Sequence, residues 1–128
     1  MDFNLQPDTQ EISAFRKEVR EWLDKNMKGS ERLSWSATWS TRENEEEYQF
    51  RRELGRKLGE KGWLFPMFPV EYGGGGLTIE HQMVVETELA RYGFNLGRVF
   101  YTIARIIAPV ILKWGTEEQK QKFLVPML

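Results

Sequence analysis

The sequence predicts an all-α fold, a helical bundle of about five helices with no sheet. Two observations predict it. Apolar residues recur at steps of three and four in several separate segments, and no segment strictly alternates apolar and polar residues as a half-buried strand does. The 128 residues, of which 41% are hydrophobic, suffice for one domain, so we expect a single core.

The first helix is predicted at residues 8–27. Its apolar residues form one stripe at helical spacing: Ile12, Phe15, Val19, Trp22, Leu23 and Met27. Asp8 and Glu11 are suited to cap its start, and Gly29 is placed to end it. The following residues, 28–44, are polar with two tryptophans among them, and they predict a long loop held by aromatic anchors.

A second helix is predicted to begin at Asn44, because three acidic residues follow and complement the positive end of the helix dipole. Its inner stripe consists of Phe50, Leu54 and Leu58. Gly62 is placed to end it. Residues 63–77 contain two prolines and the glycine run 73–76, which predict a structured loop between helices.

The glycine run 73–76 invites comparison with a phosphate-binding loop. It has neither the Gly-x-Gly-x-x-Gly spacing nor that of a P-loop, and no predicted strand precedes it. We therefore interpret it as a tight loop, in which glycines permit positive φ angles and close packing.

The third helix is predicted at residues 79–92, with Thr78 as its cap and apolar residues over a wide arc. Glu86 and Glu88 point to different sides of it, so we expect no acid/base pair, and Glu86 is placed at the rim of an apolar face. His81 is the one histidine and is given a capping or surface role. We expect no metal site, because coordination needs several convergent ligands.

The fourth helix, predicted at residues 95–114, is the most apolar, and we expect it at the centre of the bundle with a kink or restart at Pro109. Gly115 separates it from a fifth helix, which opens with a capping box at residues 116–119. The chain closes on the apolar run 125–128. We interpret this end as a point where a longer protein is interrupted.

One polar stripe crosses the apolar fourth helix. Its members stand at positions i, i+3, i+4 and i+7: Arg98, Tyr101, Thr102 and Arg105. Such a stripe must face water, a cavity or a charged partner. Two interpretations stay open, a solvated stripe on a partly exposed helix and the wall of a ligand pocket.

Charge and cysteine content exclude several classes of function. The 18 basic and 19 acidic residues are interspersed, so no basic stripe indicates nucleic acid or an anionic membrane. The absence of cysteine excludes disulfides, thiolate catalysis and thiolate zinc sites. No apolar run approaches the roughly 18 residues of a membrane span, and the N-terminus does not read as a signal peptide. We expect a soluble, cytoplasmic protein.

Four blocks of sequence follow one another along most of the chain. They are Gly62-Trp63, Pro69-x-Glu71-Tyr72-Gly73-Gly74-x-Gly76-Leu77, Glu88-Leu89-Ala90-Arg91, and Gly115-Thr116-Glu117-Glu118-Gln119-Lys120-x-x-Phe123-Leu124-x-Pro126. Together they resemble the N-terminal domain of the acyl-CoA dehydrogenase family. Thr87 departs from the family pattern, which usually has a second glutamate before Glu88.

The resemblance implies that residues 1–128 form the N-terminal helical domain of a longer flavoenzyme, beside a middle β-domain and a C-terminal helical domain. FAD and the acyl-CoA thioester would lie between the three. The full-length parent would remove an α proton with a carboxylate while the β hydrogen leaves as hydride to the flavin. The family's catalytic base and principal FAD contacts lie beyond Leu128, so no catalytic or cofactor-binding residue is assigned and this part alone is not expected to be active.

In that family the helix matching residues 95–114 lines the acyl end of the pocket. The resemblance therefore makes Arg98, Tyr101, Thr102 and Arg105 a substrate-binding hypothesis. Two arginines fit a plain fatty chain poorly, since an unpaired buried charge is costly. They would instead face a neighbouring domain or a polar or carboxylated acyl group.

Several properties of the parent stay open. The full-length protein is expected to form a homo-oligomer, and its electron-transfer partner is not assigned. The same domain is similar in acyl-CoA oxidases and in certain flavin monooxygenases. A helical interaction module without a flavin partner is the alternative from another class, with residues 125–128 as its docking surface.

Overall fold

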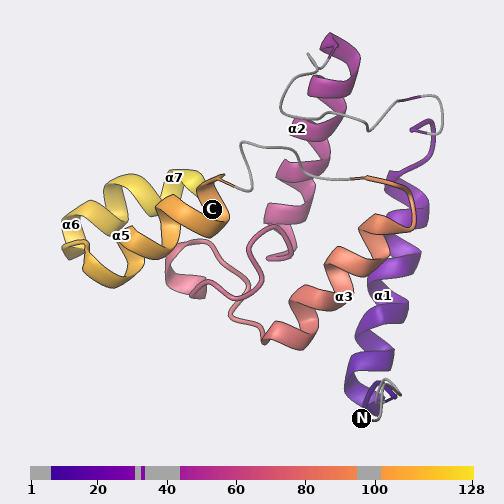
Figure 1. Ribbon diagram of the computed structural model, residues 1–128, viewed down its shortest axis with the longest axis horizontal. Helices are drawn as coiled ribbons and strands as arrows, with labels where there is room; N and C mark the ends of the chain where they lie inside the picture. Colours follow the sequence, from indigo (N-terminus) through magenta and orange to yellow (C-terminus); the bar gives the residue numbers. More distant parts are fainter. Residues whose placement is uncertain (1–6, 31–32, 34–43, 95–101) are drawn as a thin grey trace, which may run out of the picture.

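The computed structural model describes residues 7–30, 33, 44–94 and 102–128 (Figure 1). They form helices joined by loops, with no strand among them, and helix occurs in each of the five predicted segments. The all-α prediction is confirmed. The predicted long loop at residues 28–44 lies mostly outside the described part. Within that part, no helix combines the length and the apolar character that crossing a membrane requires.

The N-cap of the first helix, α1 (Gln10–Asn26), lies one residue later than predicted. The hydroxyl of Thr9, not the carboxylate of Asp8, accepts the backbone N–H in the first turn. Asp8 is engaged elsewhere, because Arg16 donates to both of its carboxylate oxygens at 2.6 and 3.1 Å. The predicted Asp8–Glu11 cap is therefore wrong.

The second helix, α2 (Glu45–Glu60), begins where the sequence predicts. Asn44 accepts from the backbone N–H of Glu47 at 2.8 Å, and the Glu47 carboxylate accepts from the Asn44 N–H at 3.4 Å. This reciprocal capping box satisfies two amides that would otherwise lack partners at the helix start. Leu54 and Leu58 of the predicted inner stripe are buried.

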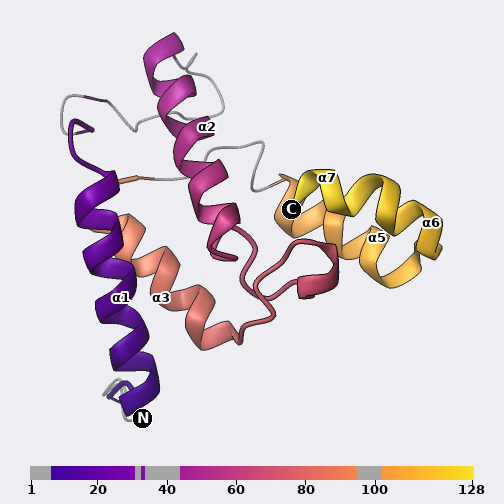
Figure 2. The same ribbon diagram turned by 180° about the vertical axis from the view of Figure 1, so that it is seen from behind.

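The third helix, α3 (Ile79–Ala90), packs along α1, and the two lie side by side in both views of the chain (Figures 1 and 2). Thr78 stands at its N-cap, but its hydroxyl contacts Nδ1 of His81 at 2.9 Å and caps no backbone amide. His81 is buried and meets the Phe15 ring edge-on, so a surface role for His81 is wrong. The ring fills space between α1 and α3.

The chain ends in a helical hairpin, which we define as residues 102–128. One arm is a π-helical turn, η2 (Ile103–Ile107), that continues as α5 (Ala108–Trp114), with Pro109 in the first turn of α5. A proline inside a continuous helix removes one backbone hydrogen bond, and the π-helical turn stands directly before it. The other arm consists of α6 (Glu117–Gln119), η3 (Lys120–Leu124) and α7 (Val125–Met127). The predicted capping box is present, between Thr116 and Gln119.

The hairpin does not lie at the centre of the molecule, contrary to the prediction for the fourth helix. Figures 1 and 2 show it projecting to one side of α1 and α3. Ile106, Val110 and Trp114 are 62, 56 and 76% exposed. An apolar helix must be covered by something, but its composition does not say by which partner. The described part of the chain leaves this face uncovered.

Among the described residues, two hydrophobic clusters are present where the sequence predicts a single core. The larger joins α1, α2 and α3 through Val19, Leu23, Met27, Leu54, Leu58, Trp63, Val84, Val85, Leu89 and Phe94. The smaller joins the hairpin to the glycine loop, here defined as residues 63–77. Its buried members are Tyr72, Ala108 and Leu124. The single-core expectation is therefore wrong, because the loop stands between the two clusters and contributes to both.

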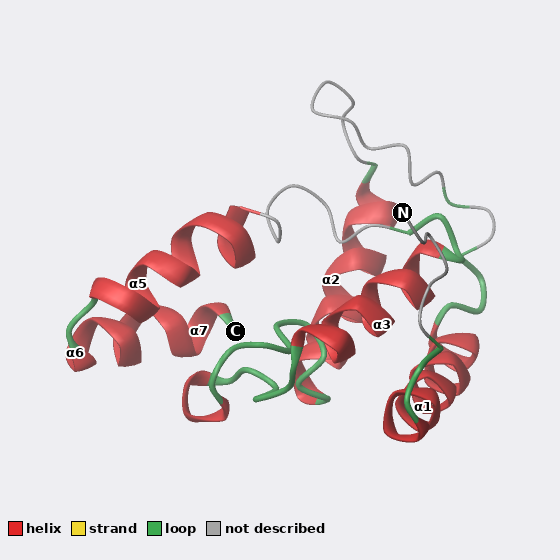
Figure 3. Cartoon of the chain, turned by 60° about the horizontal axis from the view of Figure 1, so that its bottom comes forward, coloured by secondary structure: helices red, strands yellow, loops and turns green. Residues whose placement is uncertain are grey.

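The glycine loop, which follows α2 and leads into α3 (Figure 3), is held by close approaches of backbone to backbone. A Cβ atom on Gly74 would lie 2.2 Å from the carbonyl oxygen of Phe68, and one on Gly75 would lie 2.1 Å from that of Gly62. Gly73 has a φ of 102° and ends the short 3-10 helix η1 (Val70–Tyr72). The interpretation of the run as a tight, closely packed loop is confirmed.

We expect Gly74→Ala to destabilise the protein by about 2–4 kcal/mol, because its Cβ can be accommodated only by moving the backbone at Phe68. The matched control is Gly59→Ala on α2, whose Cβ would make ordinary contacts of 3.5 and 3.8 Å. Alanine there should be neutral or stabilising by up to about 1 kcal/mol. Urea unfolding measures both, and equal stabilities of the two variants would contradict the close approach.

Candidate functional site

The structure describes half of the predicted polar stripe. Arg98 and Tyr101 lie outside the described residues. Thr102 is half-buried at the start of η2, and Arg105 is exposed one turn later. A guanidinium nitrogen of Arg105 lies 3.8 Å from a carboxylate oxygen of Glu86 on α3. The substrate-binding assignment of the stripe stays a prediction.

Glu86 connects the stripe to α3. It is half-exposed, in line with its predicted rim position, and it also accepts from the side-chain amide of Gln82 at 3.0 Å. Ile79 and Met83, on the same side of α3, are 55 and 58% exposed. An ion pair this exposed contributes little to stability. The arrangement provides a cation beside an apolar surface.

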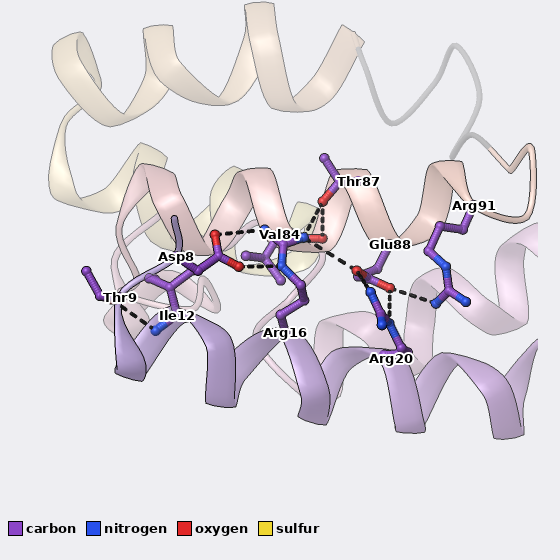
Figure 4. Close-up of polar contacts among 9 residues, drawn as sticks. All are labelled: Asp8, Thr9, Ile12, Arg16, Arg20, Val84, Thr87, Glu88 and Arg91. Carbon is purple, nitrogen blue, oxygen red and sulfur yellow. Dashed lines mark hydrogen bonds and ion pairs between the residues drawn. The ribbon is translucent and has the colours of Figure 1, made fainter. Parts of the chain in front are cut away.

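The buried carboxylate of α3 belongs to Glu88, whose side chain is 2% exposed. It lies among the guanidinium groups of Arg16, Arg20 and Arg91 (Figure 4). Arg20 donates to both of its oxygens, at 3.0 and 2.9 Å, and Arg91 donates at 2.8 Å. Arg16 adds a fourth hydrogen bond at 3.4 Å. Because Arg16 and Arg20 lie on α1, these bonds tie α1 to α3.

These guanidinium groups determine what Glu88 can do chemically. The hydrogen bond from Arg20, and after it that from Arg91, lowers the pKa of Glu88 to about 2, against the opposing effect of burial. A carboxylate with this pKa and four donors is a poor proton acceptor near neutral pH. Glu88 is therefore a structural anion and not a catalytic base.

Glu88 has no predicted role, although the sequence contains a signal for one. Arg16 and Arg20 stand four residues apart on one side of α1, and Arg91 follows Glu88 by three residues on α3. Thr87, at the position that departs from the resemblance, takes part in the same cluster. Its hydroxyl accepts from Arg16 at 3.0 Å and donates to the carbonyl of Val84 at 3.0 Å.

The glycine loop does not provide a phosphate site. The backbone N–H groups of Gly73, Gly74, Gly75, Gly76 and Leu77 all donate to backbone carbonyls within the loop, at distances of 2.7 to 3.1 Å. A phosphate cradle requires several backbone N–H groups that point at the anion. The described residues also contain no group of three histidine or acidic side chains placed to hold a metal ion.

Two of the four sequence blocks meet in space. The hydroxyl of Tyr72, in the glycine loop, donates to a carboxylate oxygen of Glu117 in the first turn of α6 at 2.8 Å. This bond, burial and the negative charge of Glu117 raise the pKa of Tyr72 to about 12. Hydrogen bonds from Gln121 and then from Tyr72 lower the pKa of Glu117. The contact spans 45 residues of sequence and had not been predicted.

The comparisons with known proteins agree on one family. A profile described as acyl-CoA dehydrogenase, N-terminal domain, matches residues 9–128. A short-chain specific acyl-CoA dehydrogenase of Clostridium acetobutylicum is 32% identical over 127 residues, which are 99% of this chain and 30% of the relative. A glutaryl-CoA dehydrogenase of Desulfococcus multivorans is 33% identical over 131 residues, covering 100% of this chain and 30% of the relative.

A solved structure gives the same answer for the fold. The crystal structure of the ChsE4-ChsE5 complex from Mycobacterium tuberculosis superposes with a TM-score of 0.71 and 27% identity. The match covers 97% of this chain and 29% of that one. The chain therefore spans about 30% of the length of the curated relatives named above.

We expect Glu88→Gln to destabilise the protein by about 2–3 kcal/mol near neutral pH, because the substitution removes the anion that three guanidinium groups share. The folded-state pKa lies below the ordinary value of 4.5, so the stabilisation is complete above about pH 5 and is lost as the pH falls toward 2. The gap between wild type and variant should therefore close in acid. Urea unfolding at several pH values measures it.

Glu86→Gln is the matched control for this experiment. It changes a half-exposed carboxylate on the same helix, and its stability should stay within about 0.5 kcal/mol of wild type. A gap between wild type and Glu88→Gln that stays constant from neutral to acid pH would contradict the role of the Glu88 charge.

Proposed function

Because this chain belongs to the acyl-CoA dehydrogenase family, as its N-terminal domain, we propose that it is part of a longer flavoenzyme. That enzyme dehydrogenates an acyl-CoA thioester to the 2-enoyl-CoA. The supporting observation is a family match over residues 9–128 in a chain that spans about 30% of its relatives' length. In the proposed parent, a middle β-domain and a C-terminal helical domain complete the enzyme.

The uncovered face of the hairpin supports a longer parent. Ile106, Val110 and Trp114 follow one another at steps of four on one side of the helical arm, and all three are more than half exposed. A contiguous apolar face on a protein surface marks an interaction site. We propose that the remainder of the parent covers it.

The proposed contribution of this domain is one wall of the acyl pocket. Thr102 and Arg105, with Arg98 and Tyr101 of the predicted stripe, would line it. The Arg105 guanidinium lies near Glu86 and beside exposed apolar side chains, which suits an acyl group with a polar or carboxylated end. The relative named glutaryl-CoA dehydrogenase, after an acyl group with a terminal carboxylate, is in keeping with this proposal.

FAD is proposed to bind mainly through other parts of the parent. The glycine loop, the one candidate phosphate site in this sequence, does not fit the cofactor because its amides are already hydrogen-bonded. No catalytic residue is assigned to this domain. Cytoplasmic location and homo-oligomeric assembly stay predictions. The similar solved structure is itself a complex of two proteins, which is in keeping with an assembled parent.

The alternatives differ in what they require. An acyl-CoA oxidase or a flavin monooxygenase would keep this domain and change the reaction of the flavin. A helical interaction module without flavin would use the exposed face around Trp114 and residues 125–128 to dock a partner.

The absorption spectrum of the protein expressed from its full uninterrupted reading frame tests the proposal. We expect a flavin band that bleaches when acyl-CoA thioesters are added without oxygen. Rapid reoxidation by oxygen would instead indicate the oxidase. A colourless protein whose reading frame stops at Leu128 would overturn the enzyme proposal in favour of the interaction module.

Arg105→Ala in the full-length protein tests the pocket wall. We expect KM for acyl-CoA with a carboxylated acyl end to rise by about tenfold or more, since a charge-assisted hydrogen bond is lost, while KM for an unsubstituted acyl chain changes little. Arg56→Ala is the control, because Arg56 is exposed on α2 and pairs with Glu53 and Glu60. Equal effects on both substrates would contradict the assignment.

A further inference from the structure

Tyr72 is the residue through which the glycine loop holds the hairpin. Its side chain is buried in the smaller cluster with Ala108 of one arm and Leu124 of the other. Its hydroxyl donates to Glu117, in the first turn of α6, where the second arm begins. One side chain therefore bonds to the start of the second arm and shares a buried cluster with residues of both arms.

The hairpin has few other attachments to the rest of the described chain. Its most extensive packing against another element is that of η3 on η1, the 3-10 helix that ends at Tyr72. Gly73 follows, and a Cβ there would meet Leu128 at 3.4 Å, so the end of the hairpin rests directly on the loop backbone. The loop thus determines where the hairpin stands relative to α1 and α3.

The hydroxyl of Tyr72 gives the contact a preferred direction, which burial of the ring alone does not. A buried ring can slide or rotate against apolar neighbours at modest cost, whereas a hydrogen bond to a carboxylate has a preferred length and direction. Tyr72 keeps its proton, because its pKa is raised to about 12, and the lowered pKa of Glu117 keeps the acceptor ionised. The bond therefore persists over the whole range of ordinary pH.

We propose that Tyr72, acting through Glu117, is a positioning residue for the acyl pocket. The arm that it holds begins with Thr102 and Arg105, and Ile103 between them packs on the same cluster. Neither Tyr72 nor Glu117 is proposed to touch the substrate. The inference rests on the proposed function, because it assumes that the arm held by the Tyr72–Glu117 bond forms a wall of the acyl pocket. Errors of about 1 Å in such a wall are enough to change rates and affinities strongly.

The test uses the full-length flavoprotein with the variants Tyr72→Phe and Glu117→Ala, which each remove the bond. Both should raise KM for the preferred acyl-CoA by about tenfold while kcat changes by less than about twofold, and both should weaken discrimination between acyl chains. The double variant should be no worse than the more affected single variant, since both remove one interaction.

Two matched variants separate positioning from general damage. Glu117→Gln keeps an oxygen that accepts from Tyr72, so it should restore most of the wild-type KM and chain preference. Glu118→Ala removes the neighbouring exposed carboxylate and should behave as wild type. Flavin content and melting temperature are measured for every variant. Glu117→Ala alters an exposed residue, which keeps the test sound if Tyr72→Phe folds poorly.

The outcomes distinguish the two proposals. If wild type is reduced by acyl-CoA, but the variants show only a lower melting temperature with unchanged KM and chain preference, the inference is overturned and the proposed function stands. If no acyl-CoA thioester reduces the wild-type flavin, the proposed function is overturned and the inference falls with it. Raised KM, lost discrimination and rescue by Glu117→Gln together support the inference.

Discussion

The close approach of backbone to backbone within the glycine loop is the constraint on which the rest of the structure depends. No side chain larger than hydrogen fits at Gly74 or Gly75, so the loop folds back on itself without spacers. This compact path lets Trp63 enter the larger cluster and Tyr72, nine residues later, enter the smaller one. In this compact loop the backbone amides, which a phosphate would need as donors, are already bonded to backbone carbonyls. The glycine loop therefore connects the larger hydrophobic cluster to the smaller one.

Charged hydrogen bonds stabilise the pairing of α1 with α3 in the larger cluster. Glu88 is buried, ionised and surrounded by Arg16, Arg20 and Arg91, so the pairing of α1 with α3 has a fixed register in addition to apolar contact. The most strongly perturbed carboxylate of the described chain is thus used for architecture. This agrees with a domain that supplies walls and supports to an active site whose reacting groups lie elsewhere in the proposed parent.

Local signals in the sequence predicted the helices well, and longer-range features less well. The helix start at Asn44, the capping box at Thr116 and the glycine loop were predictable, because each depends on residues within a few positions. The contact of Tyr72 with Glu117 was not, since nothing in either block says which distant side chain it meets. The place of the fourth helix was predicted wrongly because apolar composition indicates burial without naming the partner. Arg98 and Tyr101 stay predictions.

The presence of two clusters bears on how the chain loses its structure. A protein with one core unfolds as a unit, whereas separately packed parts open with separate free energies. Within the part of the chain that the structure describes, the hairpin is joined to the rest mainly through one loop and exposes much of its apolar surface. Its amides should therefore exchange with solvent through openings that leave α1 and α3 intact. In an assembled parent, the other domains would cover that surface, and the two clusters would unfold as one cooperative unit. Association with those domains would then be measured as slower hydrogen exchange of the hairpin amides.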